Sequence, residues 1–295
     1  MTQTTDQAPT ASDQKYVFMI GAAKCGTTAL ADMLGQHPDI NLSNPKEPDF
    51  FARKDYAASF GDYERCFDGS RPYKYRLDAS VGYSAGWNGS SRTIAKRLAA
   101  FCPTARLIYV IRDPIERTRS AYWHAVRGGY EDLGFWEAIH QPEIDHITAS
   151  QYSQRIDEYC EFFDPSQLLI VPMSDLRKDP DAVLKKIMRH LELPEVTGIA
   201  LHQETNRTYQ LSQFGRLVHR VFPKHRITST VKLIKSSLPT KLVDMLYDLY
   251  AKPIPEMRQP EGDYLAEIFA PEVAEIERRY GINLKTSKWW AASSQ

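Results

Sequence analysis

The chain has 295 residues, and its 37 acidic and 37 basic side chains give a formal net charge of +0 at pH 7. No global electrostatic field therefore favours nucleic acid or an anionic membrane surface, so any anion-binding site has to be local. The longest apolar runs, around residues 17–23 and 107–111, are far shorter than the ~18 residues that a membrane-spanning helix needs. We therefore expect a soluble, cytoplasmic protein without nucleic-acid binding or membrane insertion.

Residues 1–14 are polar and contain neither a basic segment nor an apolar core, so they predict a disordered tail rather than a signal peptide or an anchor. Residues 15–295 are expected to form a single domain, because α/β enzymes of this length often have one large core. No CxxC, HxxxH or HExxH spacing occurs, so neither a metal site nor a redox motif is predicted. Four scattered cysteines favour a reducing compartment: Cys25, Cys66, Cys102 and Cys160. Cys25 is either a small side chain in a tight loop, which we favour, or a reactive thiol at a helix N-terminus.

The first predicted element is a hydrophobic strand over residues 16–21, which leads through a tight loop into a helix over residues 27–36. Gly21 and Gly26 keep the spacing of a P-loop, in which backbone N–H groups converge on an anion at a helix N-terminus. A nucleoside triphosphatase has its lysine directly after the second glycine, whereas Lys24 lies two residues before it. An ordinary glycine turn would explain the glycines, but not the lysine together with the two threonines that follow. The pattern therefore favours a phosphate-binding loop.

More strands and helices follow along the chain. Residues 106–112 and 167–173 are continuous apolar runs, which are typical of strands buried on both faces of a parallel sheet. Asp113 and Pro114 form a helix start, an N-cap followed by proline at the first helical position. Helices are predicted over residues 91–101, 114–126, 174–191, 241–250 and 271–280. The pattern predicts an α/β fold, a P-loop-like, three-layer α/β/α arrangement around a central, mainly parallel sheet, with the ligand site at the carboxyl ends of the strands.

Two segments together carry a family resemblance. The run Lys24-Cys25-Gly26-Thr27-Thr28 is similar to the 5′-phosphosulfate loop of sulfotransferases that use 3′-phosphoadenosine 5′-phosphosulfate (PAPS). The run from Arg106 to Tyr122 resembles their 3′-phosphate motif, a strand, then Arg-Asp-Pro, then a serine eight residues after the arginine. The chain is thereby identified as a member of the PAPS-dependent sulfotransferase family, similar to its bacterial, carbohydrate or heparan-sulfate-type members.

The resemblance implies which residues bind the donor. The loop residues Lys24, Cys25, Gly26, Thr27 and Thr28 would hold the 5′-phosphosulfate, and Arg112 and Ser120 would bind the 3′-phosphate. Taken singly, Arg112 is equally compatible with a salt bridge to a neighbouring carboxylate, and Ser120 with a bond to a helical carbonyl. Gln213 to Arg216 loosely resembles the loop that closes over the PAPS phosphates, so Arg216 is either a donor-binding residue or a surface arginine, with Arg207 as a competitor. Residues 197–239 lean basic and are either solvated surface or a flexible, lid-like segment.

A third segment, residues 41–51, resembles the one that carries the catalytic glutamate in glycosaminoglycan-type members. The resemblance implies that Glu47 is the general base, with Asp49 where those enzymes often have a histidine. A loop glutamate paired with Lys46 is the alternative that the residues alone favour. Further on, Ala79 stands where heparan sulfate enzymes have a second lysine, which disfavours a heparan-like acceptor. Ser80 and Tyr83 either line the acceptor site or are ordinary buried structure.

The predicted function is transfer of a sulfuryl group from PAPS to an acceptor hydroxyl on a carbohydrate, a lipid or a small metabolite. Glu47 would take the hydroxyl proton and Lys24 would stabilise the departing oxygen, without a metal. Two alternatives remain open: a non-catalytic protein that binds PAPS or its desulfated product PAP, and, with less support, a P-loop small-molecule kinase. The acceptor's identity and the oligomeric state stay open. His124, one turn beyond Ser120, is predicted to be a helix-face residue.

Overall fold

A five-stranded, all-parallel sheet in the order β2-β3-β1-β4-β5 forms the centre of the molecule. The structure is a computed structural model that describes residues 10–11, 13–85, 90–141, 145–200, 209–211 and 251–294. The strands are β1 Lys15–Gly21, β2 Ile40–Leu42, β3 Tyr75–Asp78, β4 Arg106–Ile111 and β5 Leu168–Pro172. The predicted α/β class with a parallel sheet is confirmed.

The central strands are buried because their apolar runs are continuous. All residues of β1 after Lys15 are buried, as are all those of β4 after Arg106. Each of the three predicted strands agrees with the structure to within one residue at both ends. The strands β2 and β3 were not predicted, because they are only three and four residues long and interleave polar with apolar side chains.

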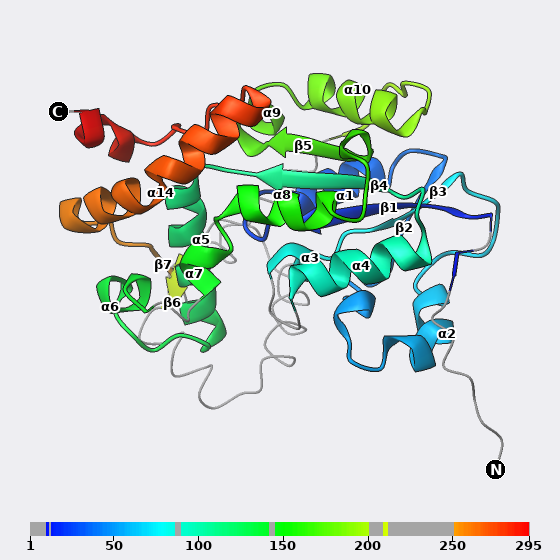
Figure 1. Cartoon of the computed structure of the whole chain (residues 1–295), viewed down its shortest axis with the longest axis horizontal. Coiled ribbons are helices and arrows are strands. Elements are labelled where there is room, and N and C mark those ends of the chain that lie inside the picture. The colour runs from blue at the N-terminus through cyan, green and yellow to red at the C-terminus, as the bar shows by residue number, and fades with distance from the viewer. Residues whose placement is uncertain are drawn as a thin grey trace, which may run out of the picture.

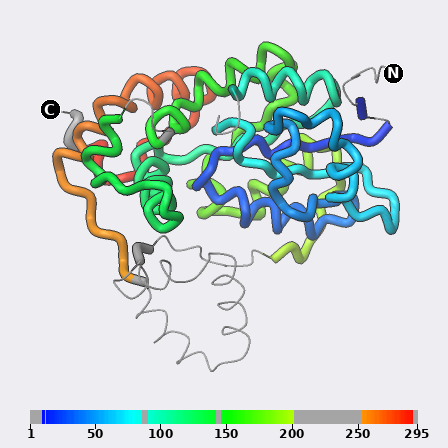
Figure 2. The backbone as a smooth tube through the Cα atoms, turned by 90° about the horizontal axis from the view of Figure 1, so that it is seen from below, coloured from blue at the N-terminus to red at the C-terminus, as the bar shows by residue number. Residues whose placement is uncertain are grey.

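Helices cover both faces of this sheet. In Figure 2 the helices α4 (Ser91–Phe101) and α8 (Tyr152–Cys160) lie on one side of the strands and α1 (Thr27–Leu34) on the other, which gives the three predicted layers. The predicted helix over residues 91–101 is confirmed at both ends. The helix predicted over residues 27–36 ends two residues earlier.

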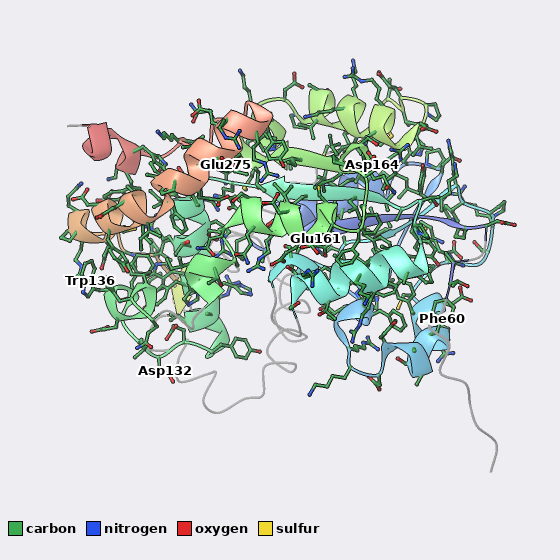
Figure 3. All side chains as sticks on the ribbon, in the orientation of Figure 1. Phe60, Asp132, Trp136, Glu161, Asp164 and Glu275 are labelled. Atoms are coloured by element: carbon green, nitrogen blue, oxygen red, sulfur yellow. The ribbon has the colours of Figure 1, made fainter. Side chains whose placement is uncertain are left out.

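A further group of helices lies beyond the carboxyl ends of the strands. Figure 1 shows β4 and β5 pointing toward α5 (Pro114–Gly128) and α14 (Gln259–Tyr280). Asp113 caps α5 as predicted, since its Oδ1 accepts from the N–H groups of Ile115 at 3.0 Å and Glu116 at 3.3 Å. Figure 3 places Asp132 and Trp136 in this group, at the opposite end of the molecule from Phe60.

Two helix predictions need correction. The single helix predicted over residues 174–191 is two helices, α9 (Met173–Lys178) and α10 (Pro180–Leu191). They are separated at Asp179, whose φ of −150° is extended because the residue before a proline is driven out of the helical region. The helix predicted from Pro271 starts twelve residues earlier, at Gln259, with Pro271 inside it. Burial of Leu265, Phe269 and Val273 offsets the one hydrogen bond that an internal proline removes.

The remaining described elements are short. They are η1 Phe50–Ala52, η2 Tyr56–Ser59, α2 Phe60–Glu64, α3 Gly82–Ala85, α6 Phe135–Ile139, α7 Asp145–Thr148, η3 Pro165–Gln167, η4 Lys288–Ser294, and the antiparallel pair β6 Tyr209–Leu211 and β7 Ala251–Pro253. Within the described ranges, no helix is long and apolar enough to span a membrane.

Several predictions fall on residues that the structure does not describe. The helix over residues 241–250, most of the segment 197–239, and both Arg207 and Arg216 lie outside the described residues. Only the end of the predicted tail 1–14 is described, and there the N–H of Ala11 donates to the carbonyl of Phe101 at 2.8 Å.

Candidate functional site

The loop between β1 and α1 is shaped by backbone conformations that favour glycine. Gly21 has a φ of 147° and Gly26 a φ of 83°, and a Cβ built on Gly21 would overlap the hydroxyl of Ser84. Lys24 also has a positive φ, 71°, which is uncommon for a residue with a side chain. Gly26 is the N-cap of α1. The first turn of this helix begins with the buried Thr27 and the exposed Thr28. The first N–H groups of a helix have no partner within it, so this turn can donate to an anion.

Cys25 lies within this loop but is fully buried. Burial raises the pKa of its thiol to about 11, so the thiol stays protonated at neutral pH. This favours the interpretation of Cys25 as a small side chain that fits a tight loop over that of a reactive thiol.

The ammonium of Lys24 lies against a histidine one hundred residues away. Its Nζ is 3.4 Å from Nδ1 of His124 on α5, and Nη2 of Arg127 is 2.8 Å from the same nitrogen. Burial, followed by the charges of Arg127 and Arg112, lowers the pKa of Lys24 to about 8. Burial and the charges of Lys24 and Arg127 lower the pKa of His124 to about 4, so at neutral pH the imidazole is uncharged and can accept a hydrogen bond.

Sequence reasoning missed this role of His124. The only signal was its position on α5, four residues after Ser120 and hence on the same side of the helix. The contact with Lys24 depends on how α5 packs beyond the end of β1, which no local pattern reveals.

Arg112 connects the loop to α5 at the carboxyl end of β4. Its Nη1 donates to the carbonyl of Lys24 at 3.3 Å, and its Nη2 to Oε2 of Glu116 at 3.1 Å. The hydroxyl of Tyr152 donates to the Arg112 carbonyl at 2.9 Å, which fixes the strand end. The salt bridge considered for Arg112 therefore exists, and its partner is Glu116. Ser120 is buried on α5, about two turns further on.

Glu47 faces the same site from the segment that follows β2. Its Oε1 lies 2.6 Å from Nζ of Lys46, so the ion pair of the alternative interpretation is present. The Lys46 ammonium also donates to the carbonyl of Ala79 at 3.3 Å. The negative charge of Glu47 acts on Lys24 and partly offsets the lowering of the Lys24 pKa. The Glu47 side chain is 34% exposed. The pairing with Lys46 thus leaves the carboxylate partly accessible and within electrostatic range of Lys24.

Asp49 lies next to Glu47 with one of its oxygens buried. Its φ is 48°, and its N–H donates to Oγ of Ser80 at 3.0 Å. Among the described residues, Oδ1 of Asp49 has no hydrogen-bond partner. Burial and the charge of Glu47 raise the pKa of Asp49 above its ordinary value.

Ser80 and Tyr83 are fully buried and lie beneath this segment. Both donate to the buried carboxyl of Asp78, Ser80 Oγ at 2.6 Å and the Tyr83 hydroxyl at 2.7 Å, and burial raises the pKa of Asp78 to about 6. The Tyr83 hydroxyl also accepts from the N–H of Phe51 at 3.4 Å. In this arrangement Ser80 and Tyr83 hold the backbone that carries Glu47 and Asp49.

A cavity of about 470 Å³ lies on the other side of Arg112. Its walls come from the end of β4 and the first turns of α5, from α9, and from two C-terminal segments, residues 256–257 and 284–289. Ser120 is not among the lining residues. Over the described ranges, no group of three or more His, Cys, Asp or Glu side chains is arranged to hold a metal ion.

The fold defines a P-loop-like α/β protein, with loop, arginine and carboxylate gathered at one edge of the sheet. Residues 14–217 match the model of the sulfotransferase domain, so the chain belongs to the sulfotransferase domain family. The family predicted from the Lys24 and Arg112 segments is thereby confirmed.

Individual relatives support this membership. The chain is 32% identical over 194 residues to bifunctional heparan sulfate N-deacetylase/N-sulfotransferase 4 of Mus musculus, which is 59% of this chain and 22% of that protein. It is 24% identical over 186 residues to heparan sulfate glucosamine 3-O-sulfotransferase 6 of Homo sapiens, which is 61% of this chain and 52% of that protein. The chain thus spans about a fifth and about half of these relatives' lengths. A sulfotransferase from Alicyclobacillus acidocaldarius has the same fold, with a TM-score of 0.64 and 22% identity over 95% of this chain and 99% of that one.

Proposed function

We propose that the protein transfers a sulfuryl group from PAPS to an acceptor hydroxyl. The observation that carries the proposal is the meeting of Lys24, Arg112 and Glu47 at the carboxyl edge of the sheet. These residues come from three separate segments, and the charges of both Arg112 and Glu47 act on Lys24. Two cations for an anionic donor and one carboxylate for a proton are the groups that the reaction requires.

The loop and α5 supply the donor site of this proposal. Lys24 and the backbone of Cys25 and Gly26 would hold the 5′-phosphosulfate, with Thr27 and Thr28 at the start of α1 adding hydroxyl and N–H donors. Arg112 would exchange the carboxylate of Glu116 for the 3′-phosphate, because a guanidinium can bind a phosphate dianion through two parallel hydrogen bonds. Ser120 would add a hydroxyl from the same helix. Arg216 is proposed as a further donor contact from sequence alone.

The chemistry assigns Glu47 and Lys24 complementary roles. Glu47 accepts the proton of the acceptor hydroxyl while the new oxygen–sulfur bond forms. The bond between sulfur and the bridging oxygen breaks in line with it, and the electron pair leaves on the phosphate of PAP. Lys24 stabilises the negative charge on that departing oxygen. The neutral His124 accepts from the Lys24 ammonium and so orients it.

The acceptor is proposed to be an alcohol of a carbohydrate, a lipid or a small metabolite. Asp49 lies beside Glu47 and is the described residue best placed to contact it, while Ser80 and Tyr83 would act by holding this segment. The relatives' names point to heparan sulfate, but the position of their second lysine is held here by the buried Ala79. A panel of alcohols, phenols and sugars, assayed with labelled PAPS, would identify the acceptor.

A substitution of the proposed base tests the function. Glu47→Gln removes the proton acceptor but keeps the size of the side chain, so we expect turnover to fall by roughly 10²-fold or more. Binding of PAP, measured by titration calorimetry, should stay within about twofold, because Glu47 contacts the acceptor side. The matched control is Glu64→Gln, which removes a carboxylate paired with Arg76 at 2.9 Å, outside this group of residues. Turnover in E47Q equal to that of the control would remove Glu47 from the mechanism.

Two alternative functions, a non-catalytic PAP-binding protein and a P-loop kinase, would give different results in the binding and sulfate-transfer assays. A non-catalytic PAP-binding protein would bind PAP but transfer no sulfate to any member of the panel, and the carboxylate of Glu47 beside Lys24 argues against it. A P-loop kinase would bind ATP in preference to PAP, and the position of Lys24 before Gly26 argues against that.

A further inference from the structure

The cavity beside Arg112 holds more positive charge than its carboxylates neutralise. Four cationic side chains line it, and three of its lining residues are acidic. Glu116 pairs with Arg112, and Glu256 pairs with Lys288 at 3.2 Å. Both oxygens of Asp113 accept from N–H groups, so this carboxylate is directed away from the arginines. Two guanidinium groups, Arg119 and Arg177, therefore have no carboxylate partner among the residues that the structure describes.

Arg119 has a donor available at the cavity. Its Nη2 donates to the carbonyl of Pro255 at 2.7 Å, whereas its buried Nε has no partner among the described residues. A buried N–H without an acceptor costs free energy, and an anion in the cavity would supply that acceptor.

Arg177 lines the same cavity as Arg112 and comes from a different element, α9. No hydrogen bond or ion pair of Arg177 to another described residue is present, although its side chain lines the cavity. Although the side chain as a whole is exposed, partial desolvation of its guanidinium, followed by the charge of Arg112, lowers the pKa of Arg177. Two like charges at one cavity repel each other, and an anion bound between them would relieve that repulsion.

The rest of the cavity suits the uncharged part of a nucleotide. Apolar side chains of Met173, Met257, Leu284 and Trp289 also line the cavity. On the segment between the last two, Ser287 lines the cavity with a buried hydroxyl that has no partner within the described ranges. A pocket lined by both apolar and cationic side chains matches a base and a phosphate on one ligand.

We propose that Arg119 and Arg177 complete, with Arg112, a site for a phosphomonoester of the donor nucleotide, and that Arg177 is the residue that selects donors carrying this group. The inference rests on the proposed function, in which the donor is PAPS and the phosphomonoester is its 3′-phosphate. A phosphomonoester dianion placed between Arg112 and Arg177 neutralises both guanidinium groups. Arg112 then no longer depends on Glu116 for its charge partner.

The test compares PAP with 5′-AMP, which lacks only the 3′-phosphate. In calorimetric titrations Arg177→Gln should weaken PAP binding about tenfold, the loss expected for one charge-assisted contact, and 5′-AMP binding less than about twofold. Lys178→Gln is the matched control, because it removes a neighbouring exposed cation that does not line the cavity. It should change neither affinity by more than about twofold, and Arg177→Lys should restore part of the PAP affinity. Arg177 is exposed, so unaltered thermal unfolding will verify that the variant folds.

The outcomes separate this inference from the proposed function. If the unaltered protein binds no PAP, the proposed function and this inference both fall. If it binds PAP but R177Q leaves the ratio of PAP to 5′-AMP affinity unchanged, only the role of Arg177 is overturned. If R177Q weakens the binding of PAP but not that of 5′-AMP, the proposed role of Arg177 is supported.

Discussion

The ammonium of Lys24 is held in an environment that weakens its charge. It is partly buried, the positive charges of Arg127 and Arg112 further lower its pKa, and the neutral His124 is its hydrogen-bond partner. An anionic ligand would reverse this balance, since it favours the charged form. The residue is thus arranged to be charged when a donor is bound and close to losing its proton when none is.

This environment predicts a pH dependence of donor binding. The pKa of Lys24 is lowered to about 8, so in the free protein the ammonium is present below pH 8 and is lost as the pH rises through that value. The phosphates of PAP are already ionised in this range. PAP affinity should therefore fall by up to about tenfold between pH 7 and pH 9, measured by calorimetric titration.

Lys24→Arg is the control for this pH dependence, because arginine keeps its charge throughout the range. The variant should bind PAP more weakly but with little change above pH 7. A loss of affinity centred on pH 8 that persists in this variant would assign the titration to another group.

At the scale of elements, Asp113 joins three parts of the fold. Its Oδ1 caps α5, and its Oδ2 accepts from the N–H groups of Thr286 at 3.2 Å and Ser287 at 2.9 Å and from the Trp290 indole at 2.9 Å. The residue is 2% exposed and directly follows Arg112. A single carboxylate thus attaches the C-terminal segment to the strand end that carries the proposed phosphate ligand.

Asp113→Asn should destabilise the protein by about 2 kcal/mol or more, because the new amide group donates where three donors already point. Urea unfolding will measure the loss. Asp179→Asn is the control, since the Asp179 side chain accepts from a single N–H among the described residues, that of Ala182, and asparagine caps helices as well as aspartate. Equal stability of the two variants would show that the bonds to the C-terminal segment contribute little.

At the scale of the molecule, the proposed donor site joins distant parts of the chain. Parallel strands direct their carboxyl ends to one edge of the sheet, where Arg112 and α9 line one cavity with residues 256–257 and 284–289. The β1 loop joins this group through the hydrogen bond from Arg112 to the carbonyl of Lys24. Figure 1 shows α14 alongside α5 at this edge. A ligand that contacts all of these segments should stabilise the whole fold.

The thermal unfolding temperature should therefore rise with PAP. At a PAP concentration of 100 Kd the gain is about 2.7 kcal/mol, which corresponds to an increase of about 4 °C for a chain of this size. ATP at the same concentration should give a smaller increase. The E47Q variant should keep the full PAP shift, and a larger shift with ATP than with PAP would favour the kinase.

Local patterns were sufficient for the strongest elements. The strands at residues 16–21 and 106–112 were predictable because continuous apolar runs followed by loop and cap residues have few other stable arrangements. Predicted helix boundaries were wrong where the effect of a proline on the helix was wrongly predicted. Asp179–Pro180 divides one predicted helix because it acts locally on the backbone, whereas burial of the α14 face overrides the effect of Pro271.

Sequence alone was sufficient for the fold class and the family, and it nominated the Lys24 loop, Arg112 and Glu47 as site residues, because each lies in a contiguous segment with its own pattern. Only the tertiary structure decided what these residues face. The contact of His124 with Lys24 and the burial of Ser80 and Tyr83 over Asp78 join residues far apart or hidden beneath the surface. The lack of a described carboxylate partner for Arg177 is also a tertiary property, because the carboxylates that line the same cavity pair with Arg112 and Lys288. Charge balance and burial are sums over neighbours in space, and the order of residues along the chain does not contain them directly.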